Sequence, residues 1–550
     1  MKQTPHFQPQ GDAALLAYLG WEIDPEINAR VRALARRLGR EPLAGVREVL
    51  AAYCCLQVQF DPLLLDHPEV EQWVRDCLAR LPEGSGEGGA LVEIPVVYGG
   101  EQGPDLEFVA RHTGLTEAEV IRRHSGTDYL CYLLGFSPGF PFLGGMDPAL
   151  AVPRLESPRL DMPVGAVGIG GAQTGLYSLG GPGGWRVIGR TPLHVYDPTA
   201  QEPCLIRAGD RVRFVPVEQA EFRPLRPAGL EEVGAGRPVF KVKRPGAFTT
   251  VQDGGRWGFQ DRGVPVSGAL DRFCLAAANL LLGNPPLTAA LEVALLGPKL
   301  EALAPVRVAV CGADLGLRRE GRPAPRNQAL SLEPGQVLDF SGPKGGSRAV
   351  LALAGGVEAP VMMGSRSVHP LGLLGGPLAA GARVRAGLDP GQPGSPAPPA
   401  LAALEEICAP RPVLELRVVP GPQEDYFSPR GRESFYNGEY TITAQSDRRG
   451  VRLEGPAVEM APGRPQSIVS EPNTPGVVQV PAGGQPIILL NEQTVGGYAK
   501  MACVITADLG ALARALPGQK VRFRPVSPKE ARQAAQEQAQ VLAGLAGQAT

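Results

Sequence analysis

The 550-residue sequence lacks several features that define large classes of protein. Its 54 basic and 56 acidic residues leave a net charge of -2, so no global field attracts nucleic acid or an anionic membrane. No apolar run approaches the roughly 20 residues of a membrane helix, and the first residues, MKQTPHFQPQGD, contain no signal-peptide core. We therefore expect no nucleic-acid partner, no membrane partner and a cytoplasmic location.

Motifs for metals, disulfides and nucleotides are absent as well. The nine cysteines include no CxxC pair and are odd in number, which predicts reduced thiols. The six histidines form neither HxH nor HExxH, so no metal site is predicted. Neither GxxxxGK[ST] nor a strand-linked GxGxxG occurs, so any nucleotide would be held by another geometry or by another chain.

Glycine and proline are abundant instead. The 71 glycines and 56 prolines are spread along the chain, a composition typical of short strands joined by tight turns. The length predicts three or four domains. We therefore expect a mainly β fold with α+β portions.

Composition also marks the domain boundaries. The Gly-, Pro- and Glu-rich stretches at 82–89, 220–238 and 387–400 are typical of linkers. Between them we expect an N-terminal α/β domain at 1–85, a β-barrel at 90–219, a β-rich part at 239–386, a second part completing another barrel at 401–526, and a C-terminal helix or tail at 527–550.

Within the first domain, a helical face at Ile27, Val31, Leu34 and Leu38 predicts one helix, and 46–60 is predicted as a single strand. The stretch DLEFVARHTGLTEAEVIRRH is predicted as one helical interruption of the first barrel.

One internal repeat is visible. AGDRVRFVPV (208–217) and PGQKVRFRPV (517–526) each close one half of the chain. The repeat favours a duplicated barrel over convergence on a common turn-and-strand motif.

Candidate binding groups gather in glycine-rich segments. LGFSPGFPFLGG (134–145) contains too many glycines and prolines for a helix or central strand, so it is either a pocket-lining loop or a rigid plug of the core. His124 ends a predicted helix, where it is either a general acid/base or a helix-end cation. The GGAQTG and IGRTP segments carry amide, hydroxyl and guanidinium groups that suit a lactam or carboxylate, or that only cap turns.

The second half contains a charged glycine-rich segment, VQDGGRWGFQDRGVPVSGALD (251–271), which favours binding over packing. QTVGGYAK (493–500) again places Gln and Thr next to glycine, which hints at a surface equivalent to GGAQTG in the first half.

These blocks resemble a known family over residues 11 to 526. In the first half, GDAALLAYLG, IDPEINARV, LGFSPGFPFLGG and PVGAVGIGGAQTGLYSLGGPGGW are similar to the B-type component of bacterial 5-oxoprolinase, also described as KipI. In the second half, TTVQDGGRWGFQDRGVPVSGALD, MGSRS, SDRRGVRLEG and QTVGGYAK are similar to the C-type component, or KipA. The family is also labelled as the two allophanate hydrolase subunits, and it is related to part of urea carboxylase.

The resemblance implies two cyclophilin-like barrel lobes after the small α/β domain. It further implies a fused B+C component that opens 5-oxo-L-proline to L-glutamate with ATP and Mg²⁺, together with a separate LamB/YcsF-type A subunit. No amidase signature and no biotin-attachment motif occurs, so neither allophanate hydrolysis by this chain alone nor a biotin cofactor is expected. The alternative is a KipI/KipA-type regulator of a histidine kinase; a homo-oligomer stays open.

We assign candidate roles accordingly, with no metal ligands. We expect one cleft of the first barrel to be lined by Phe140, His124, Gln173, Thr174 and Arg190, and a comparable cleft of the second lobe by Asp253, Arg256, Ser267, Gln493 and Lys500. The candidate catalytic residues are His124, Gln173 and Arg190, and the candidate substrate-binding residues are Phe136, Ser137, Phe140, Thr174, Thr191, Gln252, Asp253, Arg256, Ser267, Asp271, Arg366, Gln493, Thr494 and Lys500.

Overall fold

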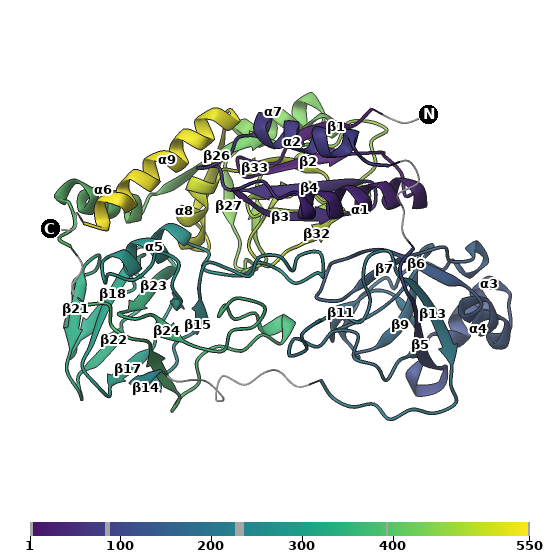
Figure 1. The fold of residues 1–550 in the computed structure, drawn as a ribbon, viewed down its shortest axis with the longest axis horizontal. Coiled ribbons are helices and arrows are strands. Elements are labelled where there is room, and N and C mark those ends of the chain that lie inside the picture. The colour runs from purple at the N-terminus through teal and green to yellow at the C-terminus, as the bar shows by residue number, and fades with distance from the viewer. Residues whose placement is uncertain (1–3, 83–87, 226–235, 392–393, 548–550) are drawn as a thin grey trace.

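The protein forms an upper layer resting on two lower lobes, as Figure 1 shows for the computed structural model, which describes residues 4–82, 88–225, 236–391 and 394–547. The N-terminal domain and the second barrel make the upper layer. The central domain and the first barrel are the two lobes beneath it (Figure 1). Each of the three predicted linkers lies partly outside the described residues.

The N-terminal domain is a four-stranded sheet in the order β1-β2-β4-β3. Helices α1 and α2 pack on one face around a core that includes Leu15, Val31 and Phe60. The prediction of one strand over 46–60 is wrong, because a tight turn closed by the Ala52 N–H to Cys55 carbonyl bond splits it into two antiparallel strands. The elements are β1 His6–Pro9, β2 Ala14–Tyr18, α1 Pro25–Arg40, β3 Val46–Ala51, β4 Cys55–Phe60 and α2 His67–Ala79.

The first barrel is closed by seven strands in the order β10-β7-β6-β13-β5-β12-β9. The single predicted helical stretch is two helices, because Gly114 takes a left-handed conformation (φ 71°) and ends α3, and Thr116 then caps α4. The strands are β5 Leu91–Tyr98, β6 Asp128–Leu134, β7 Pro141–Gly144, β9 Ala166–Gly170, β10 Gln173–Leu176, β12 Arg186–Arg190 and β13 Arg211–Pro216; the helices are α3 Leu106–Thr113 and α4 Glu117–Ser125; β8 Arg159–Met162 and β11 Gly181–Gly183 form a separate ribbon.

The central domain packs a seven-stranded sheet against a five-stranded sheet around one apolar core. The larger sheet contains β14 Arg237–Arg244, β17 Lys299–Ala302, β19 Leu317–Arg319, β20 Arg322–Pro323, β22 Val337–Phe340, β24 Val357–Glu358 and β25 Arg383–Ala386. The smaller sheet contains β15 Phe248–Gln252, β16 Ala290–Ala294, β18 Val306–Gly312, β21 Ala329–Leu332 and β23 Arg348–Leu353.

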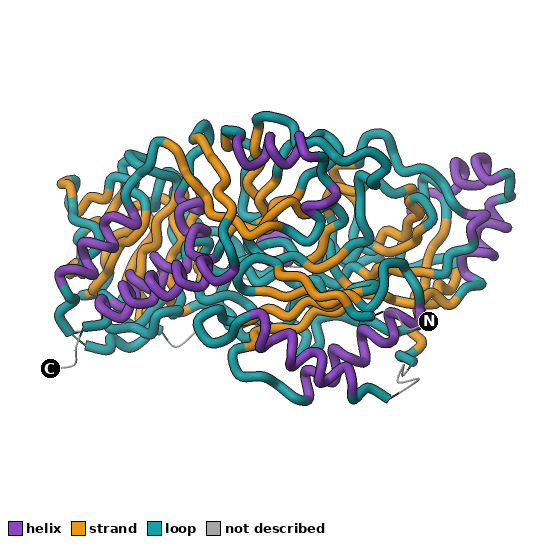
Figure 2. The backbone as a smooth tube through the Cα atoms, turned by 90° about the horizontal axis from the view of Figure 1, so that it is seen from above, coloured by secondary structure: helices purple, strands orange, loops and turns teal. Residues whose placement is uncertain are grey.

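Helices cover the outer face of the smaller sheet. An apolar cluster with Cys274, Leu404 and Leu545 joins α5 Arg272–Leu280, α6 Pro398–Cys408 and α9 Pro528–Leu545. The predicted C-terminal helix is confirmed, whereas the last residues of the predicted 387–400 linker begin α6. Seen from above, helices lie mostly on the outside and strands inside (Figure 2).

The second barrel repeats the topology of the first. Its order, β26-β33-β30-β31-β28-β27-β34, matches the first barrel strand for strand in both space and sequence. In each barrel the final strand lies parallel to the first, β13 on β5 and β34 on β26, and these final strands carry the VRF repeat. The predicted mainly β fold with two barrels is therefore confirmed. The elements are β26 Val413–Pro420, α7 Pro429–Asn437, β27 Tyr440–Ile442, β28 Gly450–Glu454, β30 Val477–Gln479, β31 Ile487–Leu489, β33 Lys500–Val504, α8 Leu509–Arg514 and β34 Lys520–Pro525, with β29 Glu471–Pro472 and β32 Val495–Gly496 as a separate ribbon.

No helix among the described residues is both long and apolar enough to cross a bilayer.

Candidate functional site

The glycine-rich segments of the two halves meet at one junction. The residue pair Leu134 and Arg262 forms a parallel bridge, and the Gly139 N–H donates to the Arg262 carbonyl at 2.8 Å. A Cβ at Gly135 would lie 2.3 Å from a methyl group of Val495. Segments 134–145, 251–271 and 493–500, predicted to serve two separate clefts, thus meet at one junction.

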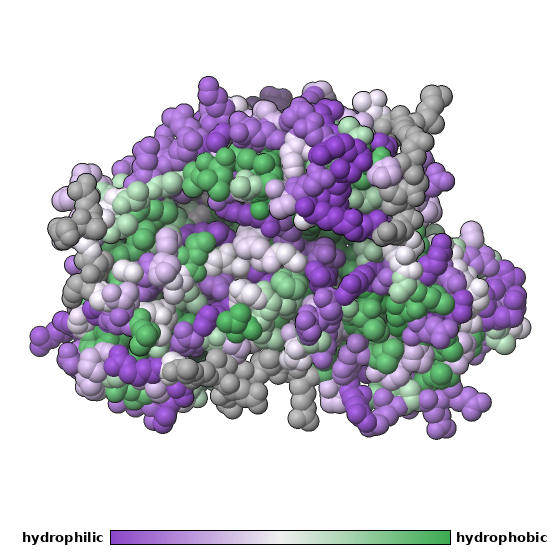
Figure 3. Space-filling model, in the orientation of Figure 1, coloured by the Kyte–Doolittle hydropathy of each residue, from purple (hydrophilic) through white to green (hydrophobic). Residues whose placement is uncertain are grey.

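A pocket of about 360 Å³ lies beside this junction, between the N-terminal domain, the central domain and the second barrel. We call it the junction pocket. Figure 3 shows the molecular face hollowed along the boundary between the upper layer and the lower lobes. The apolar lining of the junction pocket includes Phe60, Leu63, Val266, Leu270, Phe273 and Leu287. Its polar lining includes Arg47, Gln59, Asp61, Arg272, Thr474, Thr506 and Gln538.

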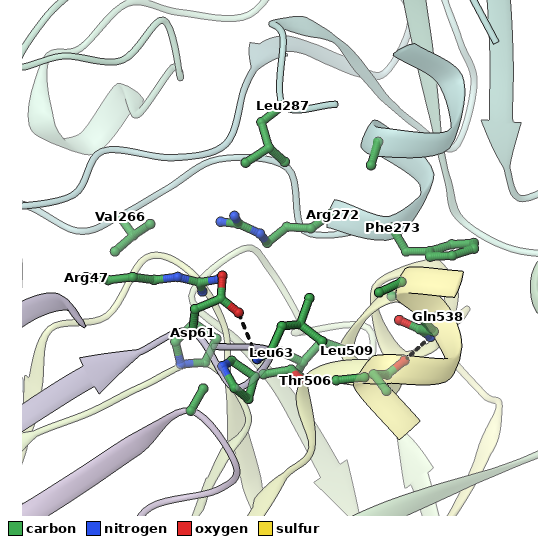
Figure 4. A pocket seen from close by; sticks show the side chains of 18 of the residues that line it. Arg47, Asp61, Leu63, Val266, Arg272, Phe273, Leu287, Thr506, Leu509 and Gln538 are labelled. Atoms are coloured by element: carbon green, nitrogen blue, oxygen red, sulfur yellow. Dashed lines mark hydrogen bonds and ion pairs between the residues drawn. The ribbon is translucent and has the colours of Figure 1, made fainter. Parts of the chain in front are cut away.

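Two arginines give the junction pocket its charge. Arg47 from β3 and Arg272 from the start of α5 extend toward each other (Figure 4), and both guanidinium groups lie over the Trp257 ring, at 5.3 and 5.9 Å from its centroid. Arg47 pairs with Asp61 at 2.9 Å. Arg272 donates to the Gly254 carbonyl at 2.6 Å, and no described carboxylate forms an ion pair with it. Burial and the neighbouring Arg47 lower the pKa of Arg272 to about 10, so it stays cationic at neutral pH.

The net positive charge therefore belongs to Arg272. An anionic group that entered the pocket would offset the cost of burying the positive charge of Arg272. It could also accept hydrogen bonds from the N–H groups of Arg272 that have no other partner among the described residues. A ligand with one anionic end and an amide-bearing ring matches the mixture of guanidinium, hydroxyl, amide and apolar surface.

A buried polar cluster continues inward from the pocket wall. Gln59 donates to the Gln57 side chain at 2.7 Å and, more weakly, contacts Gln260. Gln260 in turn donates from its backbone and its side chain to the two carboxylate oxygens of Glu48, at 2.8 and 2.7 Å. Burial raises the pKa of Glu48 to about 7, so this carboxyl group can be neutral or charged near neutral pH.

A second buried cluster surrounds Lys500. Its ammonium group donates to the Pro472 carbonyl at 2.6 Å and pairs with Glu471 at 3.0 Å. Tyr18 and Gln423 donate to the same carboxylate, each at 2.9 Å. The charge of Lys500 is thus paired with a buried carboxylate that residues of the N-terminal sheet and of the second barrel also contact.

His124 and Thr174 meet, as predicted, but inside the first barrel. The imidazole bonds to the Tyr98 hydroxyl and the Thr174 hydroxyl, each at 2.8 Å, and stacks on Phe214 with centroids 4.7 Å apart. Burial lowers the pKa of His124 to about 3, so the ring is neutral. A catalytic role for His124 stays a prediction, and these contacts are those of a core residue.

The other first-half candidates do not join His124. Gln173 contacts the Tyr53 hydroxyl at 3.4 Å, on the side of β10 opposite Thr174. The Arg190 guanidinium donates to the Val164 carbonyl at 2.9 Å and lies over Phe222. The prediction of one convergent cleft is wrong in this respect, because strand alternation and separate packing turn these side chains apart.

The side chains of the aromatic loop, 134–145, also point to different surroundings. Phe140 is buried against Tyr177 and Trp185, whereas Phe136 is 62% exposed at a positive φ of 65°. The Ser137 hydroxyl contacts that of Ser178 at 3.4 Å, and the Thr191 hydroxyl accepts the Leu193 N–H at 3.2 Å.

The predicted second-half set lies mostly in the central domain, not in the second barrel. Asp253 accepts from the hydroxyls of Ser365 and Ser367, at 2.6 and 2.5 Å, and from the Arg366 N–H. Arg256 donates to the Met362 and Ser367 carbonyls. These residues hold the loop of 362–367 against the glycine-rich segment.

The remaining candidates are placed by packing. Gln252 donates to the Val368 carbonyl, Asp271 caps α5 and pairs with Arg514, Arg366 pairs with Glu358, and the Ser267 N–H donates to the Asn491 carbonyl.

Gln493 and Thr494 precede β32, whereas Gln173 and Thr174 lie in β10. The predicted equivalence of the two Gln-Thr pairs is therefore wrong, because β32 corresponds to the ribbon strand β11.

Sequence reasoning missed Arg47, Gln59, Asp61 and Arg272. Two signals were present. Gln57 and Gln59 are polar residues in an otherwise apolar strand, and Arg272 places a cation in the first turn of a helix, where the helix dipole disfavours it. Local costs of this kind are typical of functional positions.

Among residues 4–82, 88–225, 236–391 and 394–547, no group of three or more His, Cys, Asp or Glu side chains is placed to hold a metal ion.

Matches to two family models place both halves of the chain in the carboxyltransferase-domain class. Residues 5–206 match the carboxyltransferase domain, subdomain C and D, and residues 262–525 match the carboxyltransferase domain, subdomain A and B. The two halves are also similar to separate proteins. The first is 42% identical over 222 residues to the B-type component of 5-oxoprolinase from Bacillus subtilis, covering 38% of this chain and 92% of that protein.

The second half is 36% identical over 313 residues to the C-type component of 5-oxoprolinase from Escherichia coli K12, covering 56% of this chain and 98% of that protein. The chain belongs to the family of B-type and C-type 5-oxoprolinase components, joined here in one polypeptide. A crystal structure of TTHA0988 superposes with a TM-score of 0.82 at 36% identity, covering 93% of this chain and 99% of that one.

Proposed function

We propose that this chain is the fused B+C component of an ATP-dependent 5-oxoprolinase. It opens 5-oxo-L-proline to L-glutamate together with a separate LamB/YcsF-type A subunit. The names of the relatives support a 5-oxoprolinase-type component of a multi-subunit complex.

One observation carries the proposal. The junction pocket exists only where the B-type and C-type halves meet, because Arg47, Gln59 and Asp61 come from the first half and Arg272 comes from the second. In the proposal, Arg272 binds the carboxylate of 5-oxoproline. The hydroxyl of Thr474 and the amide of Gln538 face the lactam, and Leu63 and Leu270 contact its ring.

ATP and Mg²⁺ enter the proposal from the family resemblance. The described residues contain no three-ligand carboxylate, thiol or imidazole group for a metal ion. We assign no residue of this chain to ATP or Mg²⁺ and propose that both are bound with the A subunit. The role argued for this chain is to bind and orient the lactam in a mostly apolar pocket.

Reconstitution tests the proposal. The purified chain should form glutamate from 5-oxoproline only when the A subunit, ATP and Mg²⁺ are all present. Arg272→Gln should raise KM for 5-oxoproline by about 10- to 100-fold, the loss expected for one hydrogen bond to a charged group. Glutamate release in a coupled assay measures both effects.

Arg318→Gln is the matched control, because Arg318 is an exposed arginine of the same domain. It should leave KM within about twofold of wild type, the range of ordinary surface substitutions. No glutamate formation by the complete mixture contradicts the proposed function. Wild-type KM in Arg272→Gln contradicts only the assignment of the pocket.

A further inference from the structure

A second cavity, of about 440 Å³, lies behind the first turn of α5. We call it the α6–α8 cavity. It is bounded by the end of α6, by α8 and by β26, and its lining includes Phe273, Cys408 and Arg514. Phe273, Gly510 and Gln538 also line the junction pocket, so the two spaces are neighbours.

Two cysteines from distant parts of the sequence are in contact at this wall. The sulfur atoms of Cys274 in α5 and Cys408 at the end of α6 lie 3.5 Å apart. Cys274 is fully buried, and Cys408, 5% exposed, borders the cavity. One residue of the pair therefore borders space that a small molecule can enter, and the sulfur of the other lies 3.5 Å from its own.

A cation lies against the pair. The Arg514 guanidinium is 3.5 Å from the Cys274 sulfur and pairs with Asp271, the residue that caps α5. With Cys274 as donor, the thiol–thiol hydrogen bond lowers the pKa of Cys408, and Arg514 acts in the same direction. Burial raises the pKa of Cys274. Because Cys408 borders the cavity and Cys274 lies behind it, the two thiols differ in access in the way that an attacking and a resolving thiol differ.

We propose that Cys408 and Cys274 form a thiol modification site, in which a hydroperoxide entering the α6–α8 cavity oxidises Cys408 and Cys274 resolves the product as a disulfide. The Cys408 thiolate attacks one peroxide oxygen, the O–O bond breaks, and an alcohol or water leaves. The Cys274 sulfur then attacks the Cys408 sulfenic sulfur, and the displaced hydroxide takes up the proton of the Cys274 thiol and leaves as water. Two thiols and one peroxide give one disulfide, with both electrons passing to the peroxide.

Peptide mapping of the intact, purified chain tests this inference, with hydrogen peroxide as the probe. Alkylation after denaturation should show the loss of two thiols per chain and their recovery with dithiothreitol. Digestion without reductant should yield the peptide pair joined at Cys274 and Cys408. Cys311, buried in β18, is the internal control, and Cys408 should react at least about tenfold faster because thiolate character and access decide the rate.

Two variants separate the steps. Cys274→Ser should leave a sulfenic acid on Cys408 that dimedone captures, and Cys408→Ser should leave Cys274 as slow to oxidise as Cys311. Oxidation of Cys408 no faster than Cys311 in the wild-type chain overturns the proposal, as does a disulfide to any other cysteine. The mapping does not depend on the A subunit, so its outcome is independent of the proposed function.

Discussion

Equivalent core positions of the two barrels hold different residues. His124 stacks on Phe214 in the first barrel, and Phe435 stacks on Phe523 in the second with centroids 4.3 Å apart. Tyr129 donates to the carbonyl of His124 itself, and Tyr440 donates to the carbonyl of Ser434, the residue before Phe435. A phenyl ring therefore serves where the first barrel has an imidazole, which indicates that the shape of the ring is the shared requirement.

His124 should make stability depend on pH. Its pKa falls from an ordinary 6.5 to about 3, so the folded state binds fewer protons, and this stability is present above pH 6.5 and lost as the pH falls toward 3. At pH 5 the loss is about 2 kcal/mol. Chemical denaturation at pH 7 and pH 5 should show a smaller drop for His124→Phe than for wild type.

The same variant should be less stable at pH 7 by about 1–3 kcal/mol, because the Tyr98 hydroxyl loses its partner. His112→Gln, at an exposed position on α3, should respond to pH like wild type. An equal pH response in all three proteins would contradict a buried, neutral His124.

At the scale of elements, glycine permits the close approach of the two halves. Gly263 has a φ of +73°, and a Cβ there would lie 2.6 Å from the Ser137 carbonyl oxygen. Gly258, on the same segment, has a φ of +85°, but nothing lies within 4 Å of its Cβ position. The two positions share backbone strain and differ in contact with the first barrel.

Gly258→Ala should therefore cost only the left-handed strain of about 1–2 kcal/mol. Gly263→Ala should cost at least about 1 kcal/mol more, because a backbone carbonyl must also move. Thermal unfolding of both variants measures the difference. Equal melting temperatures for the two variants would contradict the prediction, because they would mean that the contact between Gly263 and Ser137 adds no cost.

At the scale of the whole molecule, the chain joins two units that occur separately among its relatives. Each half has its own apolar cores, and two smaller apolar clusters join the halves: one contains Tyr132 and Val495, and the other contains Tyr196 and Val264. Asp12 of the first half accepts from the Thr506 N–H and hydroxyl of the second, at 3.0 and 2.6 Å. The linker is therefore not needed to specify the arrangement of the halves.

Residues 1–219 and 236–550, expressed as separate chains, should form a one-to-one complex on size-exclusion chromatography. Asp12→Ala should weaken that complex about tenfold, since two cross-half hydrogen bonds are lost and the Thr506 hydroxyl stays buried. Asp161→Ala, an exposed carboxylate of the same half, is the control and should bind as wild type. Separate elution of the unmodified halves would contradict this arrangement.

The sequence by itself determined the class of the fold. Glycine and proline spacing, helical periodicity and the VRF repeat are local signals, so they predicted short strands, an N-terminal α/β domain and a duplicated barrel. The boundaries inside 46–60 and 106–125 were missed, because a turn or a helix stop depends on one or two residues whose signal is weak beside the periodicity around them.

Only the tertiary structure decided where the side chains meet. Arg47 and Arg272 are separated by most of the B-type half, and Cys274 and Cys408 by most strands of the central domain, yet the two members of each pair lie close together. No periodicity encodes such contacts, because they arise from the docking of domains that each fold around their own core. The sequence thus determined the domains of this protein and its family, while the packing of one half against the other created its pockets.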